Sequence, residues 1–224
     1  MIFTNKKQIP GLVANAISNQ SAKYSKGDAD ISTTQLIDAP IQKILKGRHA
    51  DEIVEDVANM LWSFYGSMGH AVIDLMDSDD LIFKERRFSS SVAGWAISGQ
   101  PDYYYKDAKG ERVLADFKFT RMNTFRDGVK PEYVKQLNVY MYLLAQNGFP
   151  VDRLEIIAFF RDADYSTDEI QIFPVKMYKP YKIKEYIEKR VAMHRLFADE
   201  LIAQAPECTP KERWQAPDRY CVMK

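Results

Sequence analysis

The chain has 224 residues with 31 basic and 31 acidic side chains, a balance that argues against a protein coating nucleic acid through a strongly basic surface. A hydrophobic content of 46% beside 28% charged residues indicates a folded protein and excludes extended disorder. No apolar run approaches the about 18 residues of a membrane span, and the N-terminus lacks a signal-peptide core, so we expect a cytoplasmic protein without a membrane partner.

The first third of the chain carries helical patterns. A short helix is expected over 11–19, and Ser32 with Gln35 matches a capping box that would begin a second helix. The apolar residues of that second helix are Leu36, Ile37, Ile41, Ile44 and Leu45. A third pattern over 51–76 is interrupted by Gly66 and Gly69, which predicts a kink or a point of close packing.

Strands dominate the middle of the chain. Residue types and alternation predict strands over 81–89, 92–98, 100–106 and 111–120, followed by a polar segment over 121–130. Pro131 then opens a helix that Gly148 closes. The core stripe of that helix would be Val134, Leu137, Met141 and Leu144. Strands over 154–160 and 170–175 and a long helix over 180–205 complete the pattern.

This order predicts a single α/β domain with a mixed central sheet flanked by helices. We expect a core over 31–176, an N-terminal extension over 1–30, and a C-terminal helix and tail over 177–224. No internal repeat or low-complexity segment divides the sequence into further units.

The segment 97–118 carries the clearest chemical signal, because it predicts a hairpin with acidic residues on both strands. Gly110 suits the left-handed last position of a three-residue loop. Closing that loop places these residues opposite each other: Asp107 and Glu111, Asp102 and Asp116, Gln100 and Lys118. A two-residue loop would instead put Asp102 and Asp116 on opposite faces.

Alternation of side chains gives the two faces of this hairpin different roles. Gln100, Asp102, Asp116 and Lys118 share one face. The other face, expected to pack against a core, carries Tyr103, Tyr105, Val113, Ala115, Phe117 and Phe119. Two facing carboxylates repel each other unless a cation lies between them, so the pattern predicts a divalent metal beside a lysine. A surface hairpin with ordinary polar residues gives the same pattern.

Several other polar residues are candidates on weaker grounds. His70 ends the sequence 66–70 and is a metal-ligand type, although a lone helical histidine is more often structural. Glu85 is either an additional acid or part of a charged strand, and the sequence favours the second interpretation. Gln136 and Tyr140 share a helix face, where they would meet substrate or solvent.

The polar segment after the second hairpin strand contains Arg121, Arg126 and Lys130. These side chains would hold backbone phosphates of a nucleic acid, or would lie in a solvated loop. The sequence does not decide between these alternatives.

Together the motifs Gly66-x-x-x-His70, Gly99-x-x-Asp102, Asp116-x-Lys118 and Gln136-x-x-x-Tyr140 resemble the RecB-type branch of the PD-(D/E)xK nuclease superfamily. The resemblance covers about 32–172, and the segments 31–37 and 206–214 are similar to phage and prophage exonucleases. It implies a restriction-endonuclease-like core. It also implies Mg²⁺ or Mn²⁺ held by His70, Asp102, Asp116 and the backbone carbonyl of Phe117.

The resemblance also assigns the remaining roles. Lys118 would orient or activate the attacking water, and Gln136 with Tyr140 would lie near the substrate. Members that carry an iron–sulfur cluster use four cysteines, whereas this chain has Cys208 and Cys221 alone, so we expect no cluster and two reduced thiols.

The implied function is a metal-dependent DNA exonuclease of phage recombination or replication, with DNA and a single-strand annealing protein as partners. Ring-forming homo-oligomers are an analogy at the level of the fold. Two alternatives stay open: an endonuclease of the same fold acting on junctions, flaps or specific sites, and a non-catalytic DNA-binding relative. Asp102, Asp116 and Lys118 argue against the latter.

Overall fold

The computed structural model describes residues 2–20, 26–40, 47–73, 75, 78–165 and 168–198. The N-terminal elements are β1 (Ile2–Thr4), α1 (Gly11–Gln20), β2 (Ile31–Ser32), α2 (Thr33–Ile37), β3 (Val54–Asp56), the 3₁₀ helix η2 (Val57–Met60) and α4 (Leu61–Ile73). The central strands are β4 (Leu81–Lys84), β5 (Phe88–Val92), β6 (Trp95–Gly99), β7 (Tyr103–Lys106) and β8 (Arg112–Thr120). The C-terminal elements are η3 (Met122–Phe125), α5 (Pro131–Gln146), β9 (Arg153–Phe160), β10 (Ile170–Val175) and α6 (Pro180–Ala198).

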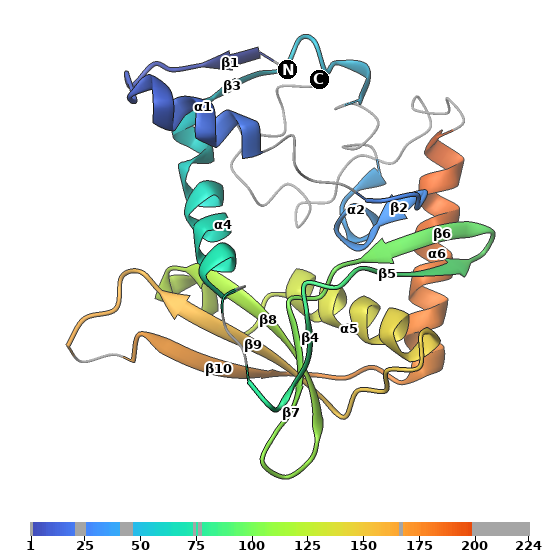
Figure 1. Cartoon of the computed structure of the whole chain (residues 1–224). Coiled ribbons are helices and arrows are strands. Elements are labelled where there is room, and N and C mark those ends of the chain that lie inside the picture. Colours follow the sequence, from blue (N-terminus) through green and yellow to red (C-terminus); the bar gives the residue numbers. More distant parts are fainter. Residues whose placement is uncertain are drawn as a thin grey trace.

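Helices flank a mixed five-stranded sheet, so the predicted α/β architecture is confirmed (Figure 1). The order of its strands is β10-β9-β8-β7-β4, with β8 and β9 parallel and the other neighbours antiparallel. A three-stranded sheet β2-β6-β5 and the parallel pair β1-β3 lie beside it. In Figure 1, α4 stands at one end of the large sheet and joins it to the unit of β1, α1 and β3. None of the helices in the described ranges is long and apolar enough to cross a membrane.

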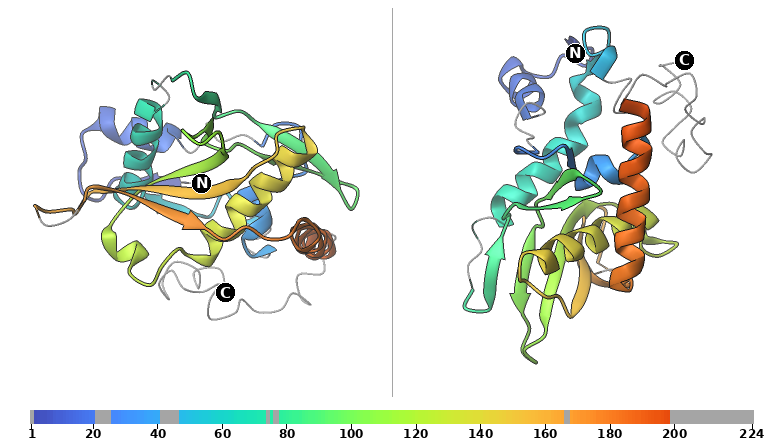
Figure 2. Two further views of the ribbon diagram at one scale, coloured as in Figure 1. Left: turned by 90° about the horizontal axis from the view of Figure 1, so that it is seen from below. Right: turned by 90° about the vertical axis from the view of Figure 1, so that its right-hand side faces the viewer.

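The main core lies between the large sheet and α5, the helix that connects the parallel strands β8 and β9. Leu137 and Leu144 of α5 are buried with Leu114 of β8 and Ile156 of β9. Figure 2 shows the long helix α6 running along the outside of the molecule. This helix packs beside α5 through a stripe of fully buried residues. These residues are Ile183, Ile187 and Val191. The layers hold β8, the strand with the Asp-x-Lys motif, at the centre of the sheet.

The predicted hairpin register is confirmed. Tyr103 pairs with Ala115 and Lys106 pairs with Arg112, which continues to Asp102 opposite Asp116. Gly110 has a left-handed backbone with φ of 81°, as the three-residue loop requires. The two acidic residues therefore lie on the same face of the hairpin.

The assignment of one hairpin face to the core was too simple, because both faces of β8 are buried. Leu114, on the face of the carboxylates, belongs to the main core beneath α5. Val113 and Ala115 on the other face are also fully buried. Their cross-strand neighbours Tyr105 and Tyr103 carry large rings, which shield these smaller side chains from solvent.

The predicted helix over 51–76 was wrong in its first third. Residues Val54–Asp56 instead form β3, which pairs with β1, and α4 begins only at Leu61. Asp56 stops the strand because its side chain accepts a hydrogen bond from the N–H of Ala58 and caps η2. Met76, at the end of the predicted helix, lies outside the described residues.

The capping box at Ser32 is confirmed, but the helix after it ends at Ile37. Ile41, Ile44 and Leu45, which were expected to continue it, lie outside the described residues, as do 199–205 of the predicted last helix. The predicted strands over 81–89 and 92–98 have other bounds in the structure, where tight turns divide this segment into β4, β5 and β6. Glu85 has φ of 43° and ends β4, while Ala93 and Gly94, with φ of 50° and 77°, form the turn between β5 and β6.

Candidate active site

Asp102 and Asp116 lie where the pairing of β7 with the central strand β8 ends, which leaves one edge of β8 open. β7 pairs with β8 only as far as Ala115, so Asp116 and the residues after it have β9 as their neighbour on one side. Asp102 immediately precedes β7, and its Oδ2 accepts a 2.8 Å hydrogen bond from the backbone N–H of Phe117. This bond holds Asp102 beside the strand that carries Asp116.

Lys118 neutralises part of the acidic charge at this edge. Its ammonium forms an ion pair with Asp116 Oδ2, a buried atom. Burial acts to lower the pKa of Lys118, but the carboxylates of Asp116 and Asp102 raise it above its usual value. One lysine thus faces two carboxylates, and the cluster keeps an excess of negative charge.

The electrostatics of Asp102 show the same excess. Burial, and then the negative charge of Asp116, raise the pKa of Asp102 well above its usual value. A cation between the two carboxylates would remove this repulsion and favour their ionised forms. The site is therefore arranged for additional positive charge.

His70 and Glu85 approach the pair from two other elements. Nδ1 of His70, on α4, lies 3.9 Å from Asp102 Oδ2 and 3.7 Å from Glu85 Oε1. Burial lowers the pKa of His70, which favours the neutral imidazole that binds metals. Glu85 lies just after β4, and its backbone N–H donates to the carbonyl of Asp102 at 2.9 Å. A role as an additional acid stays a prediction.

These groups suit a divalent cation by their chemistry. Carboxylate oxygens are the ligands that Mg²⁺ and Mn²⁺ prefer, and the repulsion between Asp102 and Asp116 exceeds what Lys118 alone offsets. The described residues contain no group of three or more His, Cys, Asp or Glu side chains already close enough to hold a metal. The four predicted ligands, His70, Asp102, Asp116 and the Phe117 carbonyl, remain a prediction.

Tyr140 is buried rather than solvated, in contrast to one of the alternatives left open by the sequence. Gln136 Nε2 donates a 3.0 Å hydrogen bond to its hydroxyl. Its ring packs on Gly99, where an added Cβ would lie 2.7 Å from the ring and 2.7 Å from Thr33 Oγ1. Gly99 therefore allows the close approach that brings α5 to the start of the hairpin.

The two candidate arginines occupy different environments. The guanidinium carbon of Arg121 lies 5.8 Å from the ring centroid of Trp62, beyond the end of β8. Arg126 is exposed and lies 3.8 Å from the carboxylate of its neighbour Asp127, so the structure gives it no contact with the acidic pair.

Two contacts at the site were missed by the sequence analysis. The ring of Tyr133 lies 4.9 Å from Lys118 Nζ. Gln100 Oε1 accepts a 2.7 Å hydrogen bond from Arg87. Tyr133 lies one turn before Gln136 on α5, a spacing that could have indicated its position. Arg87 and Gln100 continue the register of the β5–β6 hairpin beyond the pair of Phe88 with Gly99, so that register could have indicated their contact.

Comparison with known proteins supports the fold. No family model and no curated protein matches the sequence. The crystal structure of SSO0001 matches with a TM-score of 0.59 at 12% identity, over 90% of this chain and 95% of that one. The alkaline exonuclease LHK-Exo from Laribacter hongkongensis matches with a TM-score of 0.50 at 12% identity, over 78% of this chain and 92% of that one. This chain shares the fold of an alkaline exonuclease.

Proposed function

We propose that the protein is a metal-dependent deoxyribonuclease. The observation that carries the proposal is the arrangement at the open edge of β8, where Asp102 and Asp116 face each other beside Lys118. Hydrolysis of a phosphodiester needs a nucleophile at neutral pH and stabilisation of the departing oxygen. A bound Mg²⁺ or Mn²⁺ would supply an activated water and charge stabilisation.

The chain's own residues would divide the remaining work. His70 on α4 would hold the cation together with Asp102, Asp116 and the backbone carbonyl of Phe117 from the hairpin. Lys118, next to Asp116, orients the attacking water and takes part in proton transfer. Tyr133 and Tyr140 limit the freedom of the Lys118 and Gln136 side chains.

Within this activity we favour an exonuclease of the RecB-type branch that acts in phage recombination or replication. The four motifs and the shared fold of an alkaline exonuclease support this choice. The substrate would be DNA in the cytoplasm of a bacterial host cell. A single-strand annealing protein would then receive the strand that digestion exposes, and the enzyme would work as a homo-oligomer.

The test is to incubate linear and covalently closed circular DNA with the protein and Mg²⁺. We expect stepwise loss of the linear form and no change in the circle. Nicking of the circle would indicate an endonuclease of the same fold instead. No cleavage of either form, with binding retained, would indicate a non-catalytic DNA-binding protein.

A further inference from the structure

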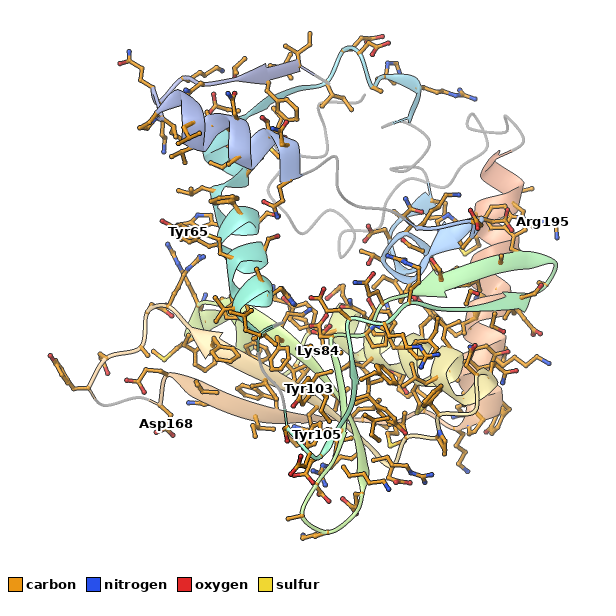
Figure 3. The ribbon with its side chains drawn as sticks, in the orientation of Figure 1. Tyr65, Lys84, Tyr103, Tyr105, Asp168 and Arg195 are labelled. Atoms are coloured by element: carbon orange, nitrogen blue, oxygen red, sulfur yellow. The ribbon has the colours of Figure 1, made fainter. Side chains whose placement is uncertain are left out.

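Two exposed aromatic rings on α4 lie outside the acidic site and have no part in the reaction proposed above. Trp62 is 49% exposed and Tyr65 is 47% exposed, with ring centroids 5.7 Å apart. Figure 3 shows Tyr65 projecting outward from α4. Adjacent large rings held at the surface mark an interaction site more often than single exposed apolar residues do.

Two arginines surround Trp62. The guanidinium carbon of Arg161 lies 3.5 Å from the centroid of its ring, and that of Arg121 lies 5.8 Å from it. These arginines follow β9 and β8 directly, and Arg161 N–H donates to the carbonyl of Thr120 at 3.0 Å. Among the described residues, the arginines that form ion pairs are Arg112, Arg126 and Arg153, and neither Arg121 nor Arg161 is one of them. Their charges therefore remain available to an anionic partner.

These residues lie next to the candidate active site. Trp62 and His70 belong to the same helix, and their separation of eight positions in sequence corresponds to about 12 Å along its axis. Arg121 follows Lys118 by three positions at the end of β8. A strand bound at Asp116 would thus reach Trp62 within a few nucleotides.

We propose that Trp62, Tyr65, Arg121 and Arg161 form a stacking platform for unpaired bases of a single DNA strand. The inference rests on the proposed nuclease function for its substrate. A base has a π-face that stacks on an indole or phenol. Arg161 covers one face of the Trp62 ring, so a base would stack on the opposite face or on Tyr65, while Arg121 and Arg161 hold the phosphates. In a duplex the faces of each base are already stacked on neighbours, so the platform selects an unpaired or frayed end.

The test measures binding of fluorescent oligonucleotides to the full chain in EDTA, so that cleavage does not interfere. The probes are oligothymidine, an abasic strand of the same length and a blunt duplex. For Trp62→Ala we expect oligothymidine to bind about tenfold more weakly, because base–aromatic stacking is lost. Binding of the abasic strand should change less than about twofold, since its phosphates still meet Arg121 and Arg161.

Matched variants keep the test decisive. Trp62→Phe retains a ring and should bind oligothymidine nearly as the wild type does, even if Trp62→Ala folds poorly. Tyr181→Ala removes a comparably exposed ring from α6 and should change nothing. Arg161→Gln should weaken binding of both single-stranded probes.

If Trp62→Ala bound each of the three probes as tightly as the wild type does, the platform would be overturned. Tighter binding of the duplex than of oligothymidine by the wild type would also overturn it. Cleavage with Mg²⁺ is recorded separately on the same preparations. If the wild type binds oligothymidine through Trp62 but does not cleave DNA, the proposal of a platform stands and the proposed nuclease function is wrong. If the wild type cleaves DNA but Trp62→Ala binds every probe as the wild type does, the nuclease function stands and the platform is wrong.

Discussion

The backbone N–H of Phe117 donates a 2.8 Å hydrogen bond to Asp102 Oδ2, so one carboxylate of the candidate site is fixed by the strand that carries the other. The acidic pair therefore depends on the register of the hairpin, which the loop at Gly110 sets. A site built on strands holds its groups more closely than one built on loops.

Replacing Lys118 with Met should separate metal binding from turnover. The variant keeps both carboxylates, so calorimetric titration should still detect Mg²⁺ binding. Cleavage of linear DNA should fall by about 10²–10⁴-fold, the range for loss of a positioned proton-transfer group. Lys109→Met, in the exposed hairpin loop, should change neither quantity. Wild-type cleavage by Lys118→Met would remove the lysine from the mechanism.

Replacing Gly69 with Ala should push α4 away from the sheet. The added Cβ would lie 2.4 Å from the ring of Phe119, and overpacking of this kind costs about 1–3 kcal/mol. Gly66→Ala is the matched control, because its Cβ meets open space and it gains about 1 kcal/mol of helix propensity. Urea denaturation of both variants measures the difference. Equal midpoints would show that α4 does not depend on this contact.

Tyr105 should make stability depend on alkaline pH. Its hydroxyl donates a 3.0 Å hydrogen bond to Glu155 Oε2. Burial, and then the charge of Glu155, raise the pKa of Tyr105 from 10.0 to about 12. Since the folded pKa lies above the unfolded one, this stabilisation is complete below pH 10 and is lost as pH rises toward 12.

The variant Tyr105→Phe tests this dependence. At neutral pH the wild type should be more stable by about 1–2 kcal/mol, because the phenylalanine leaves Glu155 Oε2 without this donor. The gap should close between pH 10 and pH 12. Chemical denaturation of both proteins across this range measures it. A gap that stays constant would show that the tyrosine hydroxyl does not carry the effect.

Arg190 should stabilise the end of α2 from the long helix α6. Its side chain donates to the carbonyls of Leu36, at 2.8 Å, and Asp38, which close the helix. Arg190→Leu would remove both donors, leaving His194 as the remaining contact of the Leu36 carbonyl, at a cost of about 1–3 kcal/mol. Lys189→Leu, exposed on the same helix, should stay within about 0.5 kcal/mol of the wild type. Thermal and urea denaturation measure the stability of both variants. An equal loss of stability in Arg190→Leu and Lys189→Leu would contradict this role of Arg190.

The sequence could predict the acidic pair because the relevant information is local. The φ of Gly110 sets the loop, the loop sets the register, and alternation then places Asp102 with Asp116. The bounds of α5 were predictable for a similar reason, since Pro131 and Gly148 act on the backbone next to them.

The rest depends on contacts between distant segments. Glu85 reaches the site because its N–H continues the pairing of β4 with β7 to the carbonyl of Asp102, and its left-handed backbone then ends the strand. Asn138 interrupts an apolar stretch of α5 yet is fully buried, because its amide donates to Lys176 and accepts from the N–H of Tyr178. Partners of this kind belong to the tertiary structure and leave no local pattern.

The most direct test of the central claim is Mg²⁺-dependent release of nucleotides from linear duplex DNA by Asp116→Asn. The substitution keeps the size of the side chain and removes the charge that faces Asp102. The wild type should release nucleotides, and the variant should do so at least about 100-fold more slowly. The free energies of unfolding of the two proteins, measured in urea, should agree within about 1 kcal/mol. Release at the wild-type rate by Asp116→Asn would contradict a metal-dependent nuclease at this edge of the sheet.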